Sequence, residues 1–203
     1  MLIAEDTQVD KVTKYLNEFA AISEDWFKER TFLQDSYEFF MEFFKKENLQ
    51  KAEWEDFQRM GNHIHSFNSM ALAKKKALGN LNHPIEHYRN SFIYLVHGED
   101  EIGKRIDNLF FDENYKIRNF GRSVLSELFG YAFADKLVLY NERDRFALDL
   151  LEIDPHFSRG DKFPQKYFKF NEAIKHVIDG YEKIVGRKTS VPINLEVDQF
   201  FIF

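Results

Sequence analysis

The chain has 203 residues, a formal net charge of −6 at pH 7 and no cysteine, with 44% hydrophobic and 31% charged residues. This balance is typical of a soluble globular protein and argues against disorder, while the missing cysteines exclude disulfides, thiolate catalysis and cysteine metal sites. The acidic charge argues against a protein that coats nucleic acid broadly, so any contact with DNA must come from a local basic patch.

No signal-like segment opens the sequence and no apolar run has transmembrane length, so we expect a cytoplasmic protein without a membrane partner. The 23 phenylalanines, several of them in doublets, are expected to fill a core rather than to form a base-stacking surface. We predict an all-α fold in one domain, residues 1–203. An alternative division sets residues 1–60 apart as an N-terminal helical lobe.

Helices are predicted in the first half wherever apolar residues recur at helical spacing. Ser23 is expected to cap a short turn, and Thr31-x-x-Gln34 has the spacing of a capping box. The expected helices are Asp6 to Ala21, a helix from Thr31 through Phe44, Ala52 to Met60, and Asn62 to Leu78.

The second half continues in the same pattern. Pro84 suits the first turn of a helix, and Asn194 is expected to cap the last one. The expected helices are Ile85 to His97, Glu101 to Phe111, Arg143 to Leu151, Pro164 to Val185, and Asn194 through Phe203. The only predicted departure from helix is a short extended segment near residues 136–140.

The stretch from Ile117 to Asn141 organises the rest of the chain, because a tight turn separates two apolar segments there. The turn reads Asn119-Phe120-Gly121, in which glycine permits a positive φ and asparagine is the next most tolerant residue. Backbone N–H groups of such a turn, where a helix begins, can face an anion such as a DNA phosphate.

This turn resembles the helix-hairpin-helix of DNA glycosylases, whose motif runs apolar-Pro-Gly-apolar-Gly. Ile117, Phe120 and Gly121 occupy three of the five positions, whereas Arg118 and Asn119 replace the proline and the first glycine. Carried over without gaps, the family's catalytic aspartate falls on Asn141 and the lysine of bifunctional members falls on Ser123. The resemblance therefore implies a helix-hairpin-helix-like corner without catalytic residues, in which Asn141 caps the following helix.

A wider resemblance covers the segments GNHIHSFNSMALAKKKALG, HPIEHYRNSFIYLVHG and IRNFGRSVLSELFGYAFADKLVLYNERDRFALDLL. Together they look like a helical region found beside McrB-type GTPase modules of modification-dependent restriction systems. There such regions act as DNA-recognition modules, so the resemblance implies DNA and a GTPase or nuclease subunit or domain as partners. The sequence lacks a GxxxxGK[ST] phosphate loop and is not itself the NTPase.

Basic residues are concentrated between positions 74 and 122. If the helix ending before Gly79 lies beside the turn, they form one phosphate-binding patch; otherwise they are solvated surface charge. The basic residues are Lys74, Lys75, Lys76, Lys104, Arg105, Lys116, Arg118 and Arg122. The predicted DNA-binding residues are Lys116, Arg118, Asn119, Gly121, Arg122, Ser123 and Asn141, with no cofactor and no metal.

Two other classes of function stay open. An enzyme, either a divergent glycosylase or a metal-dependent nuclease, would use Glu127, Asp135 or Asp144 as its acid. The pairs His63-x-His65 and His83-x-x-x-His87 have spacings that metals use, although we expect these histidines to cap or line helix entries. A protein-interaction domain would instead use an apolar face such as the terminal FFIF segment, residues 200–203.

Overall fold

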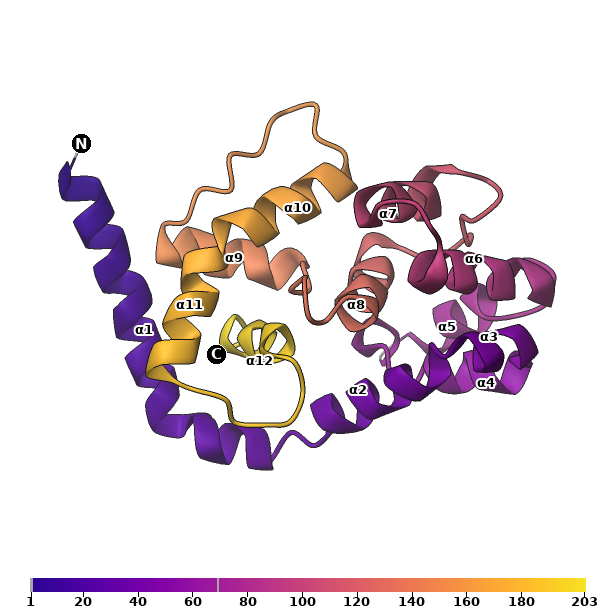
Figure 1. Cartoon of the computed structure of the whole chain (residues 1–203), viewed down its shortest axis with the longest axis horizontal. Coiled ribbons are helices and arrows are strands. Elements are labelled where there is room, and N and C mark those ends of the chain that lie inside the picture. The colour runs from indigo at the N-terminus through magenta and orange to yellow at the C-terminus, as the bar shows by residue number, and fades with distance from the viewer. Residues whose placement is uncertain (1, 69) are drawn as a thin grey trace. The chain divides into compact units, whose positions relative to one another are not determined.

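The computed structural model describes the backbone of residues 2–68 and 70–203 and the side chains of residues 11–68 and 70–203. Within these ranges the chain forms helices and connecting loops without a strand, which confirms the predicted all-α class (Figure 1). No helix in the described ranges is both long enough and apolar enough to cross a membrane.

The chain falls into two compact units. The central unit is the continuous segment Asp35–Ala132. The discontinuous unit combines the segment that ends at Gln34 with Phe133–Phe203. Residues 1–60, the expected N-terminal lobe, therefore contribute to both units.

The discontinuous unit is built around the long first helix. Its helices are α1 (Leu2–Lys28), α9 (Glu142–Leu151), α10 (Phe163–Ala173), α11 (Lys175–Ile184) and α12 (Ile193–Phe200). Leu16 and Phe19 of α1 are fully buried, and the ring of Phe19 lies 6.1 Å from Tyr181 and 5.7 Å from Phe200. Helices α1, α11 and α12 thus share one aromatic core.

The central unit is packed in the same way. It contains most of α2 (Phe32–Phe43), then α3 (Lys46–Lys51), α4 (Trp54–Met60), the 3₁₀ turn η1 (His65–Phe67), α5 (Ala71–Ala77), α6 (Ile85–His97), α7 (Ile102–Phe111) and α8 (Arg122–Ala132). Phe57 is fully buried, and its ring lies 5.8 Å from Phe43, 5.7 Å from Phe92 and 5.3 Å from Tyr88. These contacts confirm that the phenylalanines fill a core.

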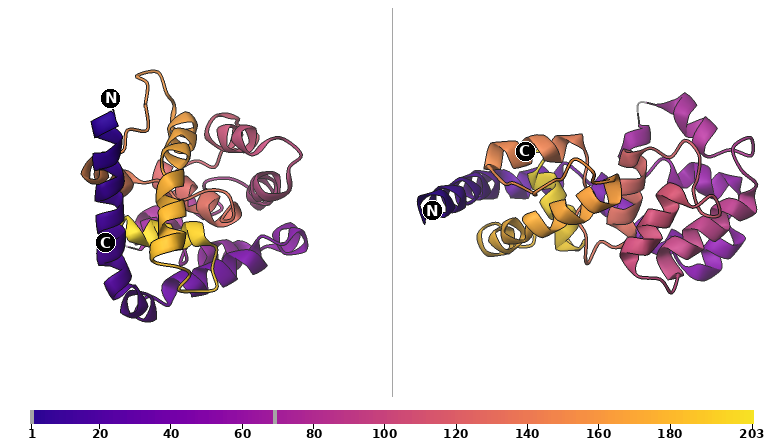
Figure 2. Two further views of the ribbon diagram at one scale, coloured as in Figure 1. Left: turned by 60° about the vertical axis from the view of Figure 1, so that its left-hand side comes forward. Right: turned by 90° about the horizontal axis from the view of Figure 1, so that it is seen from above.

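The first helix is longer than predicted. It continues past Ala21 to Lys28 as one helix (Figure 2), so the prediction of a separate capped turn at Ser23 is wrong. Ser23 is fully buried inside α1, and its hydroxyl donates to the carbonyl of Ala20 at 3.0 Å. A serine that can bond the preceding turn of its own helix does not need to end it.

Two predicted helices are broken. Residues 62–78 form η1 and α5 instead of one helix, and the Glu127 carboxylate accepts the N–H groups of His65 and Ser66 at the start of η1 at 2.6 and 2.8 Å. Residues 164–185 form α10 and α11, which meet at the fully buried Ile174. Both breaks lie at contacts with residues distant in sequence or at buried positions, which periodicity does not reveal.

The last helix begins at Ile193 and ends at Phe200, before the predicted end at Phe203. Asn194 is not its cap, since it lies within the first turn and its buried amide donates to the carbonyl of Ala134 at 2.9 Å. Pro192 occupies the N-cap position instead. The asparagine therefore fixes α12 against the chain that follows α8 rather than starting the helix.

The segment predicted to be extended near residues 136–140 is not a strand. Lys136 closes a turn by donating its N–H to the carbonyl of Phe133 at 2.8 Å, and residues 137–140 are buried. The N–H of Val138 donates to Asn171 Oδ1 at 2.7 Å, and Asn171 Nδ2 donates back to the Val138 carbonyl at 3.3 Å. The side-chain amide of Asn171 thus forms hydrogen bonds with both backbone groups of Val138. In a strand, a neighbouring strand would supply these hydrogen bonds.

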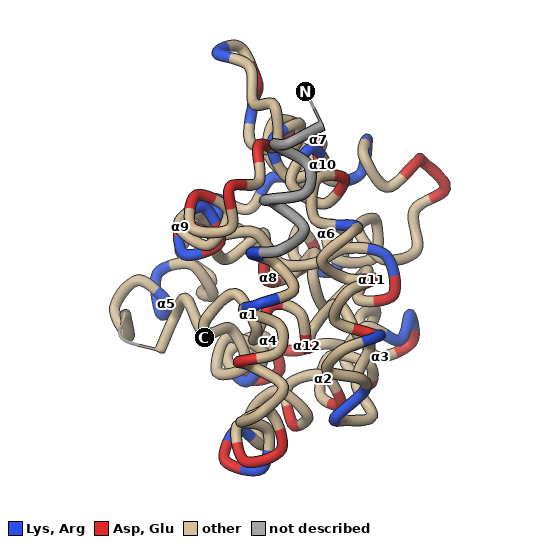
Figure 3. Tube along the Cα trace, turned by 90° about the vertical axis from the view of Figure 1, so that its left-hand side faces the viewer, with Lys and Arg blue, Asp and Glu red and all other residues tan. Residues whose placement is uncertain are grey.

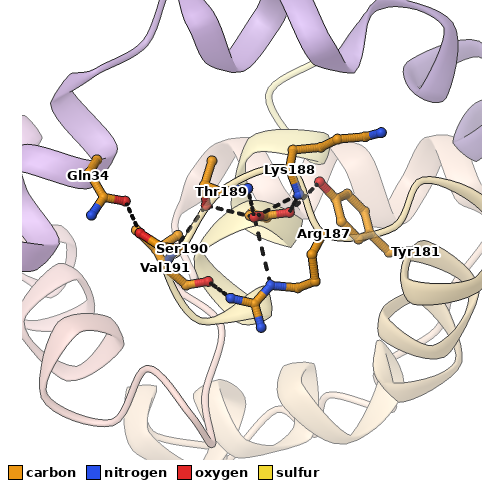
Figure 4. A network of polar contacts seen from close by, with 8 residues as sticks. Gln34, Tyr181, Arg187, Lys188, Thr189, Ser190 and Val191 are labelled. Atoms are coloured by element: carbon orange, nitrogen blue, oxygen red, sulfur yellow. Dashed lines mark hydrogen bonds and ion pairs between the residues drawn. The ribbon is translucent and has the colours of Figure 1, made fainter.

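The loop between α11 and α12 is ordered by one buried acid. Glu196 is fully buried, and its carboxylate accepts the N–H and hydroxyl of Thr189 at 2.7 and 2.6 Å, as drawn in Figure 4. It also accepts the N–H of Lys188 at 3.1 Å and the hydroxyl of Tyr181 at 3.2 Å. The carboxylate of Glu196 is therefore the main acceptor within this loop, which Ser190 and Lys188 also tie to Gln34 and Glu24.

Candidate nucleic-acid interface

The turn that connects α7 to α8 can be followed in Figure 1. Its polar residues Arg118 and Asn119 are exposed and its two apolar residues are buried. Ile117 and Phe120 are buried, with 5% and 8% of their surface exposed, and the N–H of Phe120 donates to the Ile117 carbonyl at 3.2 Å. Five of the predicted DNA-binding residues in this turn and the start of α8 are exposed: Arg118, Asn119, Gly121, Arg122 and Ser123. The two apolar residues therefore anchor a turn whose intervening residues face solvent.

The backbone conformation of the turn distinguishes the two residues that tolerate a positive φ. Asn119, with φ of 65°, takes the left-handed conformation, whereas Gly121 does not have a positive φ. The side chain of Asn119 donates to Asn82 Oδ1 at 3.1 Å, which holds this residue in place. Asparagine is the non-glycine residue that tolerates this region best, so the turn does not need glycine there.

Gly121 has another structural role, as the N-cap of α8. Its carbonyl accepts the N–H of Leu125 at 3.0 Å, and a Cβ added to it would meet nothing within 4 Å. A glycine N-cap supplies no side-chain oxygen to the first N–H groups of the helix. Residue 121 therefore supplies no side-chain cap to the start of α8.

Three side chains brace the turn from the segment that precedes and begins α6. Asn82 Nδ2 donates to the Arg118 carbonyl at 2.7 Å and to the Ala77 carbonyl at 3.1 Å. The N–H of Arg118 donates to His83 Nε2 at 3.1 Å, and His87 Nε2 donates to the Lys116 carbonyl at 2.9 Å. We had not predicted the role of Asn82, although its place before His83-Pro84 at a helix start marks it as a residue that bonds backbone.

The two bracing histidines have defined protonation requirements. Their rings stack at 4.1 Å, and His83 must be neutral at Nε2 to accept the Arg118 N–H. Burial lowers the pKa of His83, and the positive charges of His87 and Arg118 lower it further against an opposing effect of Glu113. The turn is therefore braced fully only while His83 is unprotonated.

We expect the free energy of unfolding to fall as the pH is lowered through about 6.5, the ordinary pKa of histidine. The folded-state pKa of His83 is lowered, so the unfolded chain binds a proton first and stability is retained above that pH. The loss should be about 0.5–1 kcal/mol, the size of one hydrogen bond. Urea titrations from pH 5 to 8 measure it.

The matched variants for this pH dependence are His83→Gln, which keeps an acceptor but cannot titrate, and His176→Gln at an exposed position of α11. His83→Gln should flatten the pH dependence, while His176→Gln should leave it unchanged. Burial also lowers the pKa of His63. His63 therefore contributes to the change of the free energy of unfolding with pH in both variants. Equal slopes for wild type and His83→Gln would contradict the prediction.

The predicted basic patch is smaller than the sequence suggested. Arg105 donates to the carbonyls of Leu95 and Val96 at 2.8 and 3.0 Å, so it closes the end of α6. Lys104 pairs with Asp100 at 2.9 Å, and Lys74 bonds Asn62. Lys and Arg, in blue, and Asp and Glu, in red, are interspersed along the described chain in Figure 3.

The end of α5 nevertheless lies beside the turn. This placement was the condition for the basic residues of the two segments to form one patch. Asn82 Nδ2 donates to a carbonyl of each, Ala77 in α5 and Arg118 in the turn. The exposed lysines of this α5 turn are Lys75 and Lys76. Lys116 is half-buried and pairs with Glu113 at 3.4 Å, an exposed pair worth little that a stronger anion can displace.

The other histidine pair and one candidate acid are structural. Glu127 is buried with its carboxylate on the N–H groups of His65 and Ser66, and burial raises its pKa against these hydrogen bonds. His63 stacks on Phe39 at 4.1 Å, and its Nδ1 lies 3.2 Å from the Ser36 hydroxyl. Among the described side chains, no three His, Asp or Glu groups are placed to hold a metal ion.

Asn141 belongs to the discontinuous unit and caps α9, as its sequence position predicted. Its Oδ1 accepts the N–H of Arg143 at 2.8 Å, while the carboxylate of Asp144 accepts the N–H of Asn141 to complete a capping box. This is the structure that neutral asparagine favours at a helix start. Another candidate acid, Asp135, is exposed in the turn after α8.

Asp144 forms part of a buried acidic cluster with Asp198 and Tyr167. Asp144 is fully buried, Asp198 is 5% exposed, and no hydrogen-bond donor in the described part of the chain reaches Asp144 Oδ1. Burial raises the pKa of Asp144 well above its usual value, and the nearby Asp198 carboxylate raises it further. The same two carboxylates, together with complete burial, raise the pKa of Tyr167.

We expect Asp198→Asn to raise the free energy of unfolding at pH 8, because the Asp198 carboxylate adds to the effect of burial in disfavouring the charged form of Asp144. The folded-state pKa of Asp144 is raised, so its proton is lost first from the unfolded chain and stability falls as pH rises above about 4. Removing the neighbouring charge weakens that fall. Denaturant unfolding at pH 4 and 8 tests this, and an equal effect at both pH values would contradict it.

The terminal FFIF segment docks within its own unit. Phe200 and Phe201 are buried, while Phe203 is 46% exposed and lies 5.4 Å from Phe19. An open apolar groove of about 420 Å³ runs beside it between α1 and α9, where Phe146 is 61% exposed. Phe200 and Phe201 therefore belong to the core of this unit, while Phe203 lines the groove and stays partly exposed.

Comparison with known proteins adds no assignment, because no family model, no curated protein and no solved structure matches this chain.

Proposed function

We propose that the central unit binds the phosphate backbone of duplex DNA through the turn at residues 116–123. The observation that carries this proposal is the braced turn itself: Asn82, His83 and His87 hold its backbone while Arg118 and Arg122 are exposed at the start of α8. A rigid backbone loses little conformational entropy on binding, so phosphate contacts contribute more to the affinity. The resemblances to helix-hairpin-helix corners and to DNA-recognition modules of restriction systems support the same function.

The chemistry of binding follows from charge and helix geometry. The amides of Arg122 and Ser123 at the start of α8 and the Ser123 hydroxyl donate to one phosphate. Arg118, Arg122 and Lys116 neutralise that phosphate and its neighbours, and each neutralised phosphate releases counterions. The proposed module holds DNA without cutting it and uses no cofactor. Its partner in a restriction system is a GTPase or nuclease subunit or domain.

A titration of fluorescent 20-base-pair duplexes at several salt concentrations tests the proposal. We expect a micromolar or tighter Kd at about 50 mM salt and a log–log slope of about −2 to −3, since each phosphate contact contributes about −0.9. Duplexes with and without modified cytosine or adenine are compared at matched salt. Salt-independent binding, or no binding to any duplex, overturns the proposal.

A further inference from the structure

The connection between α5 and α6 carries an apolar side chain that the fold does not use. Leu81 is 99% exposed, and the N–H of Asn82 donates to the Gly79 carbonyl at 3.0 Å to close the tight turn that presents it. Leu72 of α5 is 85% exposed and lines the same open groove as Leu81, with a volume of about 500 Å³. Two leucines at such exposure on one groove form a patch rather than a scattered surface residue.

Leu81 is held rigidly. The residue that follows it, Asn82, donates through Nδ2 to the carbonyls of Ala77 and Arg118 and lies 2.9 Å from the hydroxyl of Tyr88. Tyr88 is fully buried in the core of the central unit. The exposed leucine therefore stands on a fixed support, and no ordering of the loop is needed for it to bind.

The position of Leu81 relates it to the proposed phosphate-binding turn. Asn82 accepts the Asn119 amide at 3.1 Å and donates to the Arg118 carbonyl at 2.7 Å, so Leu81 is one residue away from direct contact with that turn. Adjacent Cα atoms are about 3.8 Å apart. The backbone of Leu81 is therefore close to the backbone of the turn that carries Arg118.

The chemistry around Leu81 matches a polyanion with an apolar interior. The groove is lined by apolar side chains, Trp54, Leu72 and Leu78 among them, and by the cations Lys75 and Lys76. Both lysines are exposed and belong to the α5 turn that shares Asn82 with Arg118. Duplex DNA offers both kinds of surface, because its stacked base pairs are apolar and its phosphate backbone is negatively charged. Leucine is one of the side chains that enter base steps as a wedge.

We propose that Leu81 is a wedge that enters a base step of the duplex held by the turn at residues 116–123, which kinks the DNA there. This inference rests on the proposed function of that turn. Because unstacking costs least at flexible or mismatched steps, the wedge selects duplexes with a pyrimidine–purine step or a mismatch over a uniformly stiff duplex. Selectivity of this kind needs no hydrogen bond to a base.

The experiment uses the full chain and duplexes that carry 2-aminopurine at successive positions around a central mismatch or TA step. Wild type should raise the 2-aminopurine fluorescence at one step and bind the mismatched duplex about tenfold more tightly than a matched A-tract duplex. Leu81→Ala should lose both effects while keeping the salt slope, and Leu81→Met should retain them. Leu150→Ala, at a 54% exposed leucine of the discontinuous unit, is the matched control.

The outcomes separate this inference from the proposed function. Salt-dependent binding with no fluorescence change at any step, or equal behaviour of Leu81→Ala and wild type, overturns the wedge and leaves the phosphate-binding turn. Absence of any DNA binding overturns both. A change of sedimentation coefficient in Leu81→Ala without a change in DNA binding assigns the patch to an interface between protein copies, and also overturns the wedge.

Discussion

The double variant Arg118→Ala/Arg122→Ala should bind duplex DNA about 10–100-fold more weakly than wild type at about 50 mM salt. Each arginine is expected to neutralise a backbone phosphate, and one contact of this kind is worth roughly a tenfold change in Kd, about 1.4 kcal/mol. Loss of two contacts should also reduce the magnitude of the salt slope by about 2. The weakening should be similar for all duplex sequences, because phosphate contacts carry no sequence information.

The control for this variant removes the same charge elsewhere. Lys175→Ala/Lys183→Ala changes two exposed cations of α11 in the discontinuous unit, so net charge falls equally. For this control variant we expect less than a threefold loss of affinity, caused by the change in net charge. The dependence of log Kd on log salt concentration should stay nearly the same. An equal loss of affinity in both double variants would show that binding depends only on the net charge of the protein. That result would contradict a specific role for the turn. Circular dichroism checks that both variants stay helical.

The variant Glu196→Ala should lower the free energy of unfolding by about 3–5 kcal/mol, because several part-buried donors lose their acceptor at once. It removes the acceptor for the N–H groups of Lys188 and Thr189 and for the hydroxyl of Thr189. Each part-buried donor left without an acceptor costs about 1–3 kcal/mol. The loop at residues 187–191, drawn in Figure 4, should lose protection against hydrogen exchange.

Two companion variants isolate the carboxylate in this network. Glu196→Gln keeps the shape but presents an amide N–H₂ to backbone donors, so its loss of stability should lie between those of wild type and Glu196→Ala. Glu182→Ala, at an exposed position in α11, should change stability by no more than about 0.5 kcal/mol. Urea unfolding at pH 7 measures all three. A loss below about 1 kcal/mol in Glu196→Ala would mean that the loop is held by other contacts.

The helices that the sequence predicts best are those whose ends are marked locally. Ile85 to His97 is observed as predicted, although Pro84 lies at the N-cap position rather than in the first turn, and Gly98 follows the helix. The helix predicted from Glu101 begins at Ile102 and ends at Phe111 as expected. Asn141 caps α9 as its residue type suggests. In each case the start or end depends on backbone preferences within a few residues, which a sequence displays directly.

Helix breaks and reassigned polar residues required the tertiary structure. Nothing near His65 in sequence shows that Glu127, 62 residues later, would take its N–H. Asn194 looks like a cap and is instead a buried amide that bonds Ala134. Buried polar groups seek partners wherever packing brings them, and packing joins residues far apart in the chain.

The sequence by itself determined the all-α class, the use of phenylalanine as core and the location of the turn between Ile117 and Gly121. Apolar periodicity and turn-forming residues are local properties, so they can be read without contacts. Only the tertiary structure decided that Asn119 rather than Gly121 takes the positive φ and that Asn82 joins the turn to α5. The conformation of a turn is set by the side chains that fold onto it, and those come from elsewhere in the chain.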